Sequence, residues 1–349
     1  MFGLTLMFAL HFVRTHGQSV TIDKEPAPVA YYRMPDKPLD PAYSTYSADI
    51  RVYSGDLLRA GISEASLRSE YLVLDGYTRV ANNGDVHIEA QVSDFTVFSE
   101  RRESRQRRTK DKQGKEIITT FYWIEVKYAL PVSMTVSNKK GHVLDDNFIF
   151  TLTDQRAYST PQQRSISDLD RYWRINRTRQ LAELHKDILT DAFKKIYENV
   201  NNSFGYIRIT NENARFETIG RKRHKDYVRF RNAYETINKG FKLMDPDKSL
   251  NPVRKAVEPA LAFYQNQAPR YSANDKDALK LKHICLYNLA LAYFWLEDFD
   301  AAKKFAEEMI ALDDRDRDAR RLLEDIQEVR ESISRAQRVS RHQKQVSGT

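Results

Sequence analysis

Hydrophobic and polar positions alternate with a period of two over much of residues 49–154, which is typical of strands that bury one face. Within residues 86–99 the apolar phase slips by one position at Ser93, and such a slip predicts a β-bulge. Residues 117–136 alternate without a slip, but Pro131 lacks an amide hydrogen, so this strand must bend or lie at a sheet edge. We expect an antiparallel β-sandwich-like domain here.

The apolar period changes to three and four residues after position 165, which predicts helix. Residues 165–203 form one long amphipathic helix or two in succession, and Gly205 is the expected C-cap. Residues 206–220 are ambiguous, and a pair of strands returning to the sheet is one interpretation. Beyond residue 226 the pattern is helical throughout. The fold class we expect is therefore α+β with two domains, the second of them helical.

Residues 276–311 divide into two helices joined by a short connection at residues 296–299, so the helices should be antiparallel neighbours. The stretch LYNLALAYFWLEDFDAAKKFAEEMIALDD carries small residues where helices approach closely and aromatic residues that fill the space between them. It resembles the tetratricopeptide repeat. The matching positions are Leu289, Ala290, Tyr293, Phe299, Ala302, Leu312 and Asp313. An alanine in place of the usual glycine, Met309 and Asp314 depart from the family pattern and make the repeat a divergent one.

A weaker copy of the same pattern spans residues 234–263, although the stretch MDPDKSLNPV breaks the spacing of the family. Apolar residues between 322 and 336 would form the capping helix that such arrays require. The resemblance implies an α-solenoid whose first helices line a concave groove for a protein partner. Carried over by position, the groove residues are Tyr287, Asn288, Leu291 and Phe294. The alternative is that Leu291 and Phe294 pack against a neighbouring helix.

The chain begins with an apolar run over residues 2–13, which is too short to span a bilayer but suits a secretory signal. Thr15 and Gly17 provide the small side chains of a cleavage site after residue 17, although no basic residue precedes the run. An uncleaved anchor or a buried segment is the alternative. Cys285 is the only cysteine, so no intramolecular disulfide can form. These features favour export to the periplasm or outer-membrane periphery of a Gram-negative bacterium, with no spanning segment after cleavage.

A segment rich in proline and tyrosine follows, and five prolines between positions 26 and 41 exclude a helix there. Its tyrosines favour docking onto the next domain rather than free disorder. The complete organisation we expect is a signal peptide (1–17), a Pro/Tyr-rich arm (18–48), an antiparallel β domain (49–154), a long helix plus short strands (155–225), a repeat domain with a capping helix (226–340) and a disordered tail (341–349).

The chain carries a formal charge of +8, and its densest basic stretch is RRESRQRRTKDKQGK at residues 101–115. This stretch lies between the two alternating segments, with Gly114 as a turn residue, so it should be the protruding tip of a long hairpin. A second basic cluster, GRKRHKD, occupies residues 220–226. The candidate anion-binding cations of the hairpin are Arg101, Arg102, Arg105, Arg107, Arg108, Lys110 and Lys112. A solvated loop without a ligand is the alternative, and for an exported protein we expect no nucleic-acid partner.

Motifs of known catalytic chemistry are missing from the sequence, which has no HExxH, GxSxG, Walker A or GxGxxG. Asp314, Asp316 and Asp318 have the spacing of a calcium loop, but Ala319 replaces the glycine that its sharp turn requires. A turn between repeats, with Asp318 or its neighbour capping the last helix, is the better interpretation. We therefore expect no catalytic residue, metal or cofactor. The function expected is a non-enzymatic adaptor or scaffold for protein partners in the cell envelope, and the alternative is a module that binds anionic envelope polymers or lipid headgroups through the hairpin.

Overall fold

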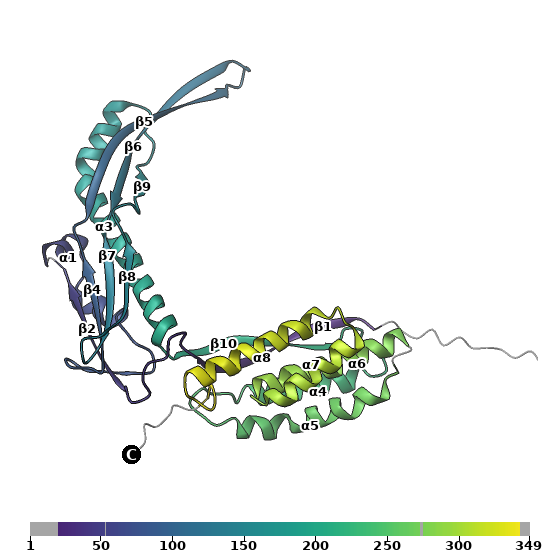
Figure 1. The fold of residues 1–349 in the computed structure, drawn as a ribbon. Coiled ribbons are helices and arrows are strands. Elements are labelled where there is room, and N and C mark those ends of the chain that lie inside the picture. Colours follow the sequence, from purple (N-terminus) through teal and green to yellow (C-terminus); the bar gives the residue numbers. More distant parts are fainter. Residues whose placement is uncertain (1–19, 53, 273–274, 343–349) are drawn as a thin grey trace, which may run out of the picture. The chain divides into compact units, whose positions relative to one another are not determined.

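The computed structural model describes residues 20–52, 54–272 and 275–342, so the expected signal peptide lies outside the described residues. The described chain divides into two compact units (Figure 1). The sheet unit comprises residues 33–208 and 335–338, and the helical unit comprises residues 20–32, 209–334 and 339–342. The N-terminal region is rich in strands and the C-terminal region is helical, as expected. Both units are discontinuous in sequence, unlike the consecutive domains that the sequence suggested.

Two sheets make up the β structure of the sheet unit. The five-stranded sheet has the order β3-β2-β4-β7-β8 and the three-stranded sheet has the order β5-β6-β9. Their strands are β2 (Thr45–Arg51), β3 (Thr78–Arg79), β4 (Val86–Val92), β5 (Thr96–Lys110), β6 (Glu116–Ala129), β7 (Val132–Asn138), β8 (Val143–Phe150) and β9 (Arg156–Ser159). Strand β2 runs parallel to both β3 and β4, because the short helices α1 (Ser54–Ala60) and α2 (Glu64–Glu70) lie in the connection. The first sheet is thus mixed and not wholly antiparallel.

The two long alternating runs of the sequence each change sheets partway. The phase slip at Ser93 marks the gap between β4 and β5, and the register shift lies slightly later, between Val97 and Ser99. The second run breaks at Pro131, between β6 and β7. The Ser93 amide donates to the Pro131 carbonyl at 3.0 Å, so the two breaks lie side by side. The predicted bulge is therefore a strand break, and the predicted bend at the proline is confirmed.

Helix α3 (Ile166–Phe204) covers the sheets and is one continuous helix. The Ser165 hydroxyl caps its start by accepting from the Asp168 amide, as Ser and Thr do at N-caps. Gly205 ends it with an extended backbone, and a Cβ at this position would overlap the Asn201 side chain. The core of the unit joins apolar side chains of β4, β6 and β7 to those of α3. The sheets therefore pack on a helix.

Five α-helices form the helical unit among the described residues: α4 (Tyr227–Phe241), α5 (Asn251–Gln267), α6 (Lys276–Trp295), α7 (Phe299–Leu312) and α8 (Arg317–Arg335), with a short 3₁₀ helix, η1 (Ala268–Arg270), after α5. Contacts join α4 to α5, α5 to α6 and α6 to α7. Only Leu296, Glu297 and Asp298 separate α6 from α7, so these helices run antiparallel as predicted. The helical pattern of the sequence is confirmed in this region.

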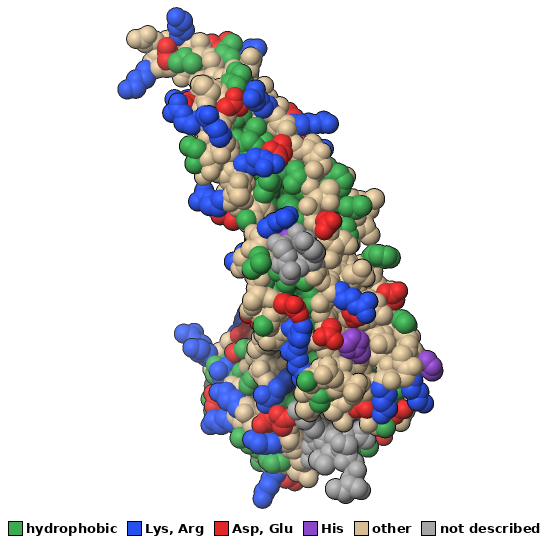
Figure 2. All heavy atoms as spheres, turned by 90° about the vertical axis from the view of Figure 1, so that its left-hand side faces the viewer, with side chains coloured by type: hydrophobic (Ala, Val, Ile, Leu, Met, Phe, Trp, Pro, Cys, Tyr) green, Lys and Arg blue, Asp and Glu red, His purple; other side chains and the backbone are tan. Residues whose placement is uncertain are grey.

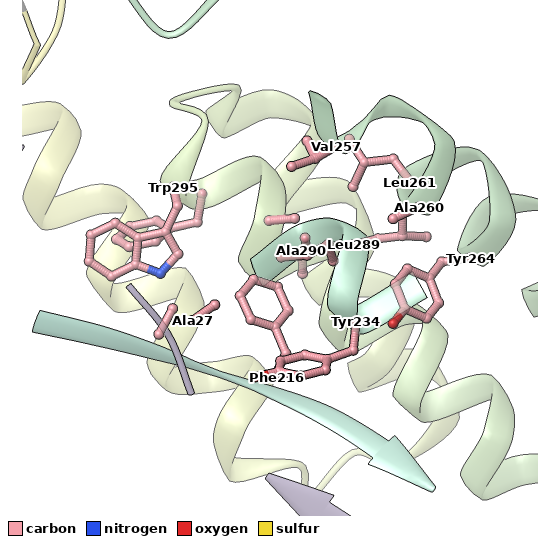
Figure 3. Close-up of a cluster of buried hydrophobic side chains, with 14 of the residues drawn as sticks. Ala27, Phe216, Tyr234, Val257, Ala260, Leu261, Tyr264, Leu289, Ala290 and Trp295 are labelled. Atoms are coloured by element: carbon pink, nitrogen blue, oxygen red, sulfur yellow. The ribbon is translucent and has the colours of Figure 1, made fainter. Parts of the chain in front are cut away.

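A two-stranded sheet of β1 (Ile22–Arg33) and β10 (Ile207–Ile219) lies against these helices. Ala27 of β1 and Phe216 of β10 are fully buried in one core with Tyr234, Leu289 and other helical residues (Figure 3). The first part of the Pro/Tyr-rich arm therefore supplies a strand to the helical unit, which was not expected. The later part packs on the domain that follows it in sequence, as predicted, because Leu39 and Tyr46 are buried in the core of the sheet unit. The ambiguous residues 206–220 form the single strand β10, which pairs with β1 and not with a returning partner.

Candidate functional site

The basic stretch lies in a two-stranded ribbon made by β5 and β6. Their pairing runs from Thr96 opposite Ala129 to Lys110 opposite Glu116, and Figure 1 shows the ribbon extending past the other elements of the sheet unit. Strand β9 pairs with β6 only between Glu125 and Tyr128, at the end of β6 that is far from the turn. Most of the expected tip is therefore strand, and the turn is confined to residues 111–115.

The turn at the end of the ribbon is closed by a side chain. The Asp111 carboxylate accepts hydrogen bonds from the amides of Gln113 and Lys115, at 2.9 and 2.8 Å. Gly114 has a φ of 83°, a conformation that residues with a side chain rarely adopt, so glycine is required at this position as expected. The turn is thus locally specified and holds the two strands in register.

The seven candidate cations of the hairpin are all exposed, and basic side chains are spread along the ribbon at the top of Figure 2. Arg102 pairs with Asp170 of α3 at 2.7 Å, and Arg108 pairs with Glu116 across the ribbon at 3.5 Å. Within the described part of the chain, no ion pair involves Arg101, Arg105, Arg107, Lys110 or Lys112. Strand alternation places Arg101, Arg105 and Arg107 on one face of the ribbon.

The base of the ribbon is attached to α3 through Glu100. Its carboxylate accepts from the Trp173 indole at 2.9 Å and from the Arg177 guanidinium at 2.6 Å. The hydrogen bond from Arg177, supported by the one from Trp173, holds the pKa of the Glu100 carboxyl below its usual value despite partial burial. The ribbon is therefore fixed to α3 at one end, through Glu100 and Arg102, while Arg105 and Arg107 make no ion pair with another described residue.

Two of the expected groove residues are occupied by the chain's own strand β10. Asn288 is fully buried, and its side-chain amide donates to the Glu217 carbonyl and accepts from the Glu217 amide, both at 2.8 Å. The Tyr287 hydroxyl donates to the Arg215 carbonyl at 3.1 Å. These two residues thus bind main chain of the same molecule and not of a partner.

The other two groove residues are also covered. Leu291 is half-buried against the helical core, and Phe294 is buried with its ring edge against Trp295 at a centroid distance of 5.1 Å. Arg341, close to the C-terminus, places its guanidinium 5.2 Å from the Phe294 ring. Segments of this chain therefore cover Tyr287, Asn288 and Phe294, and Leu291 is half-buried against the helical core.

A buried ionic cluster joins β10, α6 and the start of α8. The His283 imidazole lies between two carboxylates, with Nδ1 3.2 Å from Glu217 and Nε2 2.7 Å from Asp316. Burial alone would lower the pKa of His283, but hydrogen bonds and charges from Glu217 and Asp316 outweigh it and raise the pKa to about 9. Asp316 also caps α8 by accepting from the Ala319 amide at 3.0 Å, and Lys24 bridges Glu217 and Asp318. The turn caps α8 as predicted, but the capping residue is Asp316 and not Asp318, which lies inside the first turn of the helix.

Three other features of the described residues were candidates for a site: metal-binding clusters, the cysteine and the second basic cluster. Among them, no three histidine, cysteine, aspartate or glutamate side chains gather where a metal ion could bind. Cys285 is buried, and burial raises the pKa of its thiol. The second basic cluster lies in the connection between β10 and α4 of the helical unit, with Arg221, Lys222 and Arg223 exposed. It therefore remains a second cationic surface without an assigned ligand.

One polar cluster was missed at the sequence level. Glu297, in the connection between α6 and α7, accepts hydrogen bonds from Ser340, Arg341 and His342, which lie in or beside the tail that the sequence suggested to be disordered. Arg341 and His342 are in fact buried. No short sequence signal links Glu297 to these residues, because the partners are more than forty positions apart.

Comparison with known proteins gives no relative from which a function could be inferred. No protein-family model matches this chain, and no curated protein shows significant similarity to it. Among the described helices, none has both the length and the apolar character needed to cross a membrane.

Proposed function

We propose that this protein is a non-enzymatic adaptor of the bacterial cell envelope that binds an anionic polymer or lipid headgroup surface through its basic hairpin. A single observation carries the proposal. Arg101, Arg105, Arg107, Lys110 and Lys112 are exposed on the ribbon of β5 and β6, and no ion pair to a described residue neutralises them. Carboxylates such as Glu103 and Glu125 also lie on the ribbon, but cations outnumber them. The excess cations sum their potentials and attract an anionic partner over one Debye length, ~8 Å at physiological ionic strength.

The shape of the ribbon favours an extended or flat partner over a small molecule. Side chains on one face of a strand repeat about every 7 Å, so Arg105 and Arg107 form a row and not a cluster. A row of cations suits repeated anionic groups, such as those of a charged polymer or a lipid surface, whereas a small anion is best held by converging donors.

Apolar side chains near the turn support a lipid surface among these partners. Ile117 and Ile118 are 45% and 53% exposed, and as consecutive strand residues they point to opposite faces of the ribbon. Basic and apolar side chains together are the combination that peripheral membrane-binding segments use at the headgroup boundary. The ribbon therefore carries both the charge and the apolar groups for such a contact.

The helical unit supplies the adaptor half of the proposal. We interpret the antiparallel pair of α6 and α7 as a divergent tetratricopeptide-like repeat, and α4 with α5 as a second. The contacts of Asn288 and Tyr287 with β10 support this interpretation, because they bind an extended strand on the first-helix surface. A protein partner would then dock on another part of the unit or displace one of these segments. Export is proposed from the sequence of residues 1–17 alone.

The proposal is tested by cosedimentation with vesicles that contain phosphatidylglycerol and by retention on immobilised lipopolysaccharide. The triple variant R101Q/R105Q/R107Q should lose most of its binding, and binding of the wild-type protein should weaken as salt rises. A matched control, K239Q/K255Q/K303Q, removes the same charge from exposed positions on the helical unit and should bind like the wild-type protein.

Three results would count against the hairpin as the site. Equal loss of binding in both triple variants would show that binding depends on the net charge of the protein and not on the position of the hairpin cations. Unchanged binding in the hairpin variant would remove the site entirely. Tighter binding to a duplex oligonucleotide than to either envelope probe at the same salt would point instead to a nucleic-acid partner, because a two-stranded ribbon also fits the major groove.

A further inference from the structure

A three-residue stretch near the C-terminus, Ser340 to His342, is inserted into the helical unit and is here called the C-terminal segment. The side chains of Arg341 and His342 are only 4% and 2% exposed, which is unusual for an arginine above all. The preceding residue, Val339, is 99% exposed, so burial begins abruptly at the segment. The segment thus resembles a bound peptide more than a frayed terminus.

Aromatic rings surround the guanidinium of Arg341. Its central carbon lies 4.8 Å from the ring centroid of Tyr31 and 5.2 Å from those of Phe294 and Trp295. Arginine is attracted to ring faces at such distances, and the attraction increases where water is excluded. The three rings come from β1 and α6, so both elements are needed to build the pocket.

Glu297 provides the anionic side of the same pocket. Its carboxylate accepts from the Arg341 side chain at 3.1 Å, from the Arg341 amide at 3.0 Å and from the Ser340 hydroxyl at 2.6 Å. Burial alone would raise the pKa of the Glu297 carboxyl, but the hydrogen bonds from His342 and Ser340 and the charge of Arg341 lower it to about 2. The carboxylate is therefore charged and fully used by the segment.

Main-chain contacts fix the direction of the segment. The Tyr32 amide donates to the Arg341 carbonyl at 2.9 Å, and His342 Nε2 lies 2.8 Å from the Ala30 carbonyl. All three residues of the segment are thus contacted. Recognition by alternating main-chain and side-chain groups is the way in which folded domains bind short extended peptides.

The fit of the segment is incomplete in two places. Arg341 Nη2 and Trp295 Nε1 are buried and have no hydrogen-bond partner in the described structure. A buried donor without a partner forfeits its hydration and weakens the contact. The segment also follows residues 336–339, which have no helix or strand, so its tether to α8 is short and irregular. A peptide that offers a hydrogen-bond acceptor to Trp295 Nε1 and to its own arginine would therefore bind in this pocket better than the C-terminal segment does.

We propose that this pocket is a binding site for an arginine-bearing peptide segment of a partner protein, which displaces the chain's own C-terminal segment. Arginine is selected over lysine because only a planar guanidinium can lie against three rings while donating to Glu297. The C-terminal segment acts as a tethered competitor and keeps the apolar pocket covered until the partner arrives. This site lies on the helical unit and does not depend on the hairpin.

The experiment uses the full chain and a labelled, end-blocked peptide of the sequence Val-Ser-Arg-His-Gln-Lys, which copies residues 339–344. Fluorescence anisotropy should show weak binding to the wild-type protein and binding that is at least about tenfold tighter to R341A, because a tethered competitor acts at a high effective concentration. A peptide with lysine in place of arginine should bind R341A at least about tenfold more weakly. The double variant E297Q/R341A should not bind.

The melting temperature of R341A provides the second measurement. The peptide should raise it, because a ligand that binds only the folded state stabilises that state. Failure of the peptide to bind or stabilise R341A would overturn the proposal and leave the segment a fixed part of the fold, as would an R341A protein that stays unfolded at saturating peptide. A wild-type dimer that R341A loses would overturn it in favour of exchange between two copies.

Discussion

His283 is the residue whose environment predicts the clearest dependence of stability on pH. Its pKa is 6.5 in the unfolded chain and about 9 in the folded protein, because Glu217 and Asp316 stabilise the charged ring. A raised pKa contributes stability that is complete below pH 6.5 and is lost as the pH rises through 9. The free energy of unfolding should fall over this window by up to about 3 kcal/mol, measured by urea denaturation at several pH values.

The variant H283Q isolates this effect from other titrating groups. Glutamine keeps one donor but cannot carry a charge, so the difference in unfolding free energy between wild type and H283Q should shrink steadily from pH 6.5 to 9. Parallel curves for the two proteins would mean that His283 does not bind its proton more tightly when folded.

The residues of the candidate site were predictable to different degrees. The exposure of Arg105 and Arg107 follows from their position between two alternating strands, where charge has no core to enter. The repeat pattern singled out Asn288 and Phe294 of α6 as groove residues. The hydrogen bonds between the Asn288 side chain and the Glu217 main chain could not be predicted, because Glu217 lies in a strand seventy-one positions away.

Helix α3 is the element on which the sheet unit depends, since its apolar face is the packing partner of β4, β6 and β7. Phe193 in this helix is fully buried. We expect F193A to lower the free energy of unfolding by about 3–5 kcal/mol, through lost apolar contact and the cavity left behind. Chemical denaturation followed by the fluorescence of Trp123 and Trp173 would measure the change in this unit.

Ile175 offers a matched control within the same helix. It is also apolar but 72% exposed, so I175A should change stability by less than about 0.5 kcal/mol. If both variants were equally mild, α3 would not be the main packing partner of the sheets.

Element types were more predictable than their partners. The period of three and four residues identified α3 because its buried residues lie on one face of a regular helix. In α6 the buried residues include the consecutive run from Ile284 to Leu286, so this helix is buried on more than one face. The alternation of residues 117–136 identified strand but hid the change of sheet at Pro131, since both sheets use the same side of the chain as core. Periodicity records which face is buried and does not record what buries it.

For the whole molecule, the contribution of β1 to the helical unit can be tested directly. Val29 and Ala27 of β1 are buried, and Tyr234 donates to the Pro26 carbonyl at 2.7 Å. Burial of one valine side chain is worth about 1.5–3 kcal/mol. A chain that begins at residue 33 should therefore exchange the amide hydrogens of α6 at least about tenfold faster, measured by hydrogen exchange with mass spectrometry.

The sheet unit and an added peptide provide the controls for this deletion. Protection of β4 and β7 should stay unchanged, and a peptide of residues 20–33 should restore protection of α6 when added to the shortened chain. A peptide with aspartate at positions 27 and 29 should fail, because both side chains enter the core. Unchanged exchange in α6 after the deletion would show that the helices alone hold the unit.

The sequence patterns could not predict that each unit is built from separate parts of the chain. Prolines at positions 26 and 28 indicate an extended segment but cannot indicate which domain it joins. The pairing of β1 with β10 places the sheet unit, in chain order, inside the helical unit. Local rules apply to neighbours in sequence, so a contact across such an insertion leaves no local trace.

This insertion sets the order in which the protein can be completed during synthesis. At roughly 5–20 residues per second, β1 leaves the ribosome some ten seconds or more before β10 exists, and the sheet unit can fold in the interval. The contact between the Ala30 carbonyl and His342 forms late, because His342 lies 312 positions after Ala30. A nascent chain therefore carries an unpaired, partly apolar strand for most of its synthesis, and slowing translation before residue 207 should make it more dependent on chaperones than its final stability suggests.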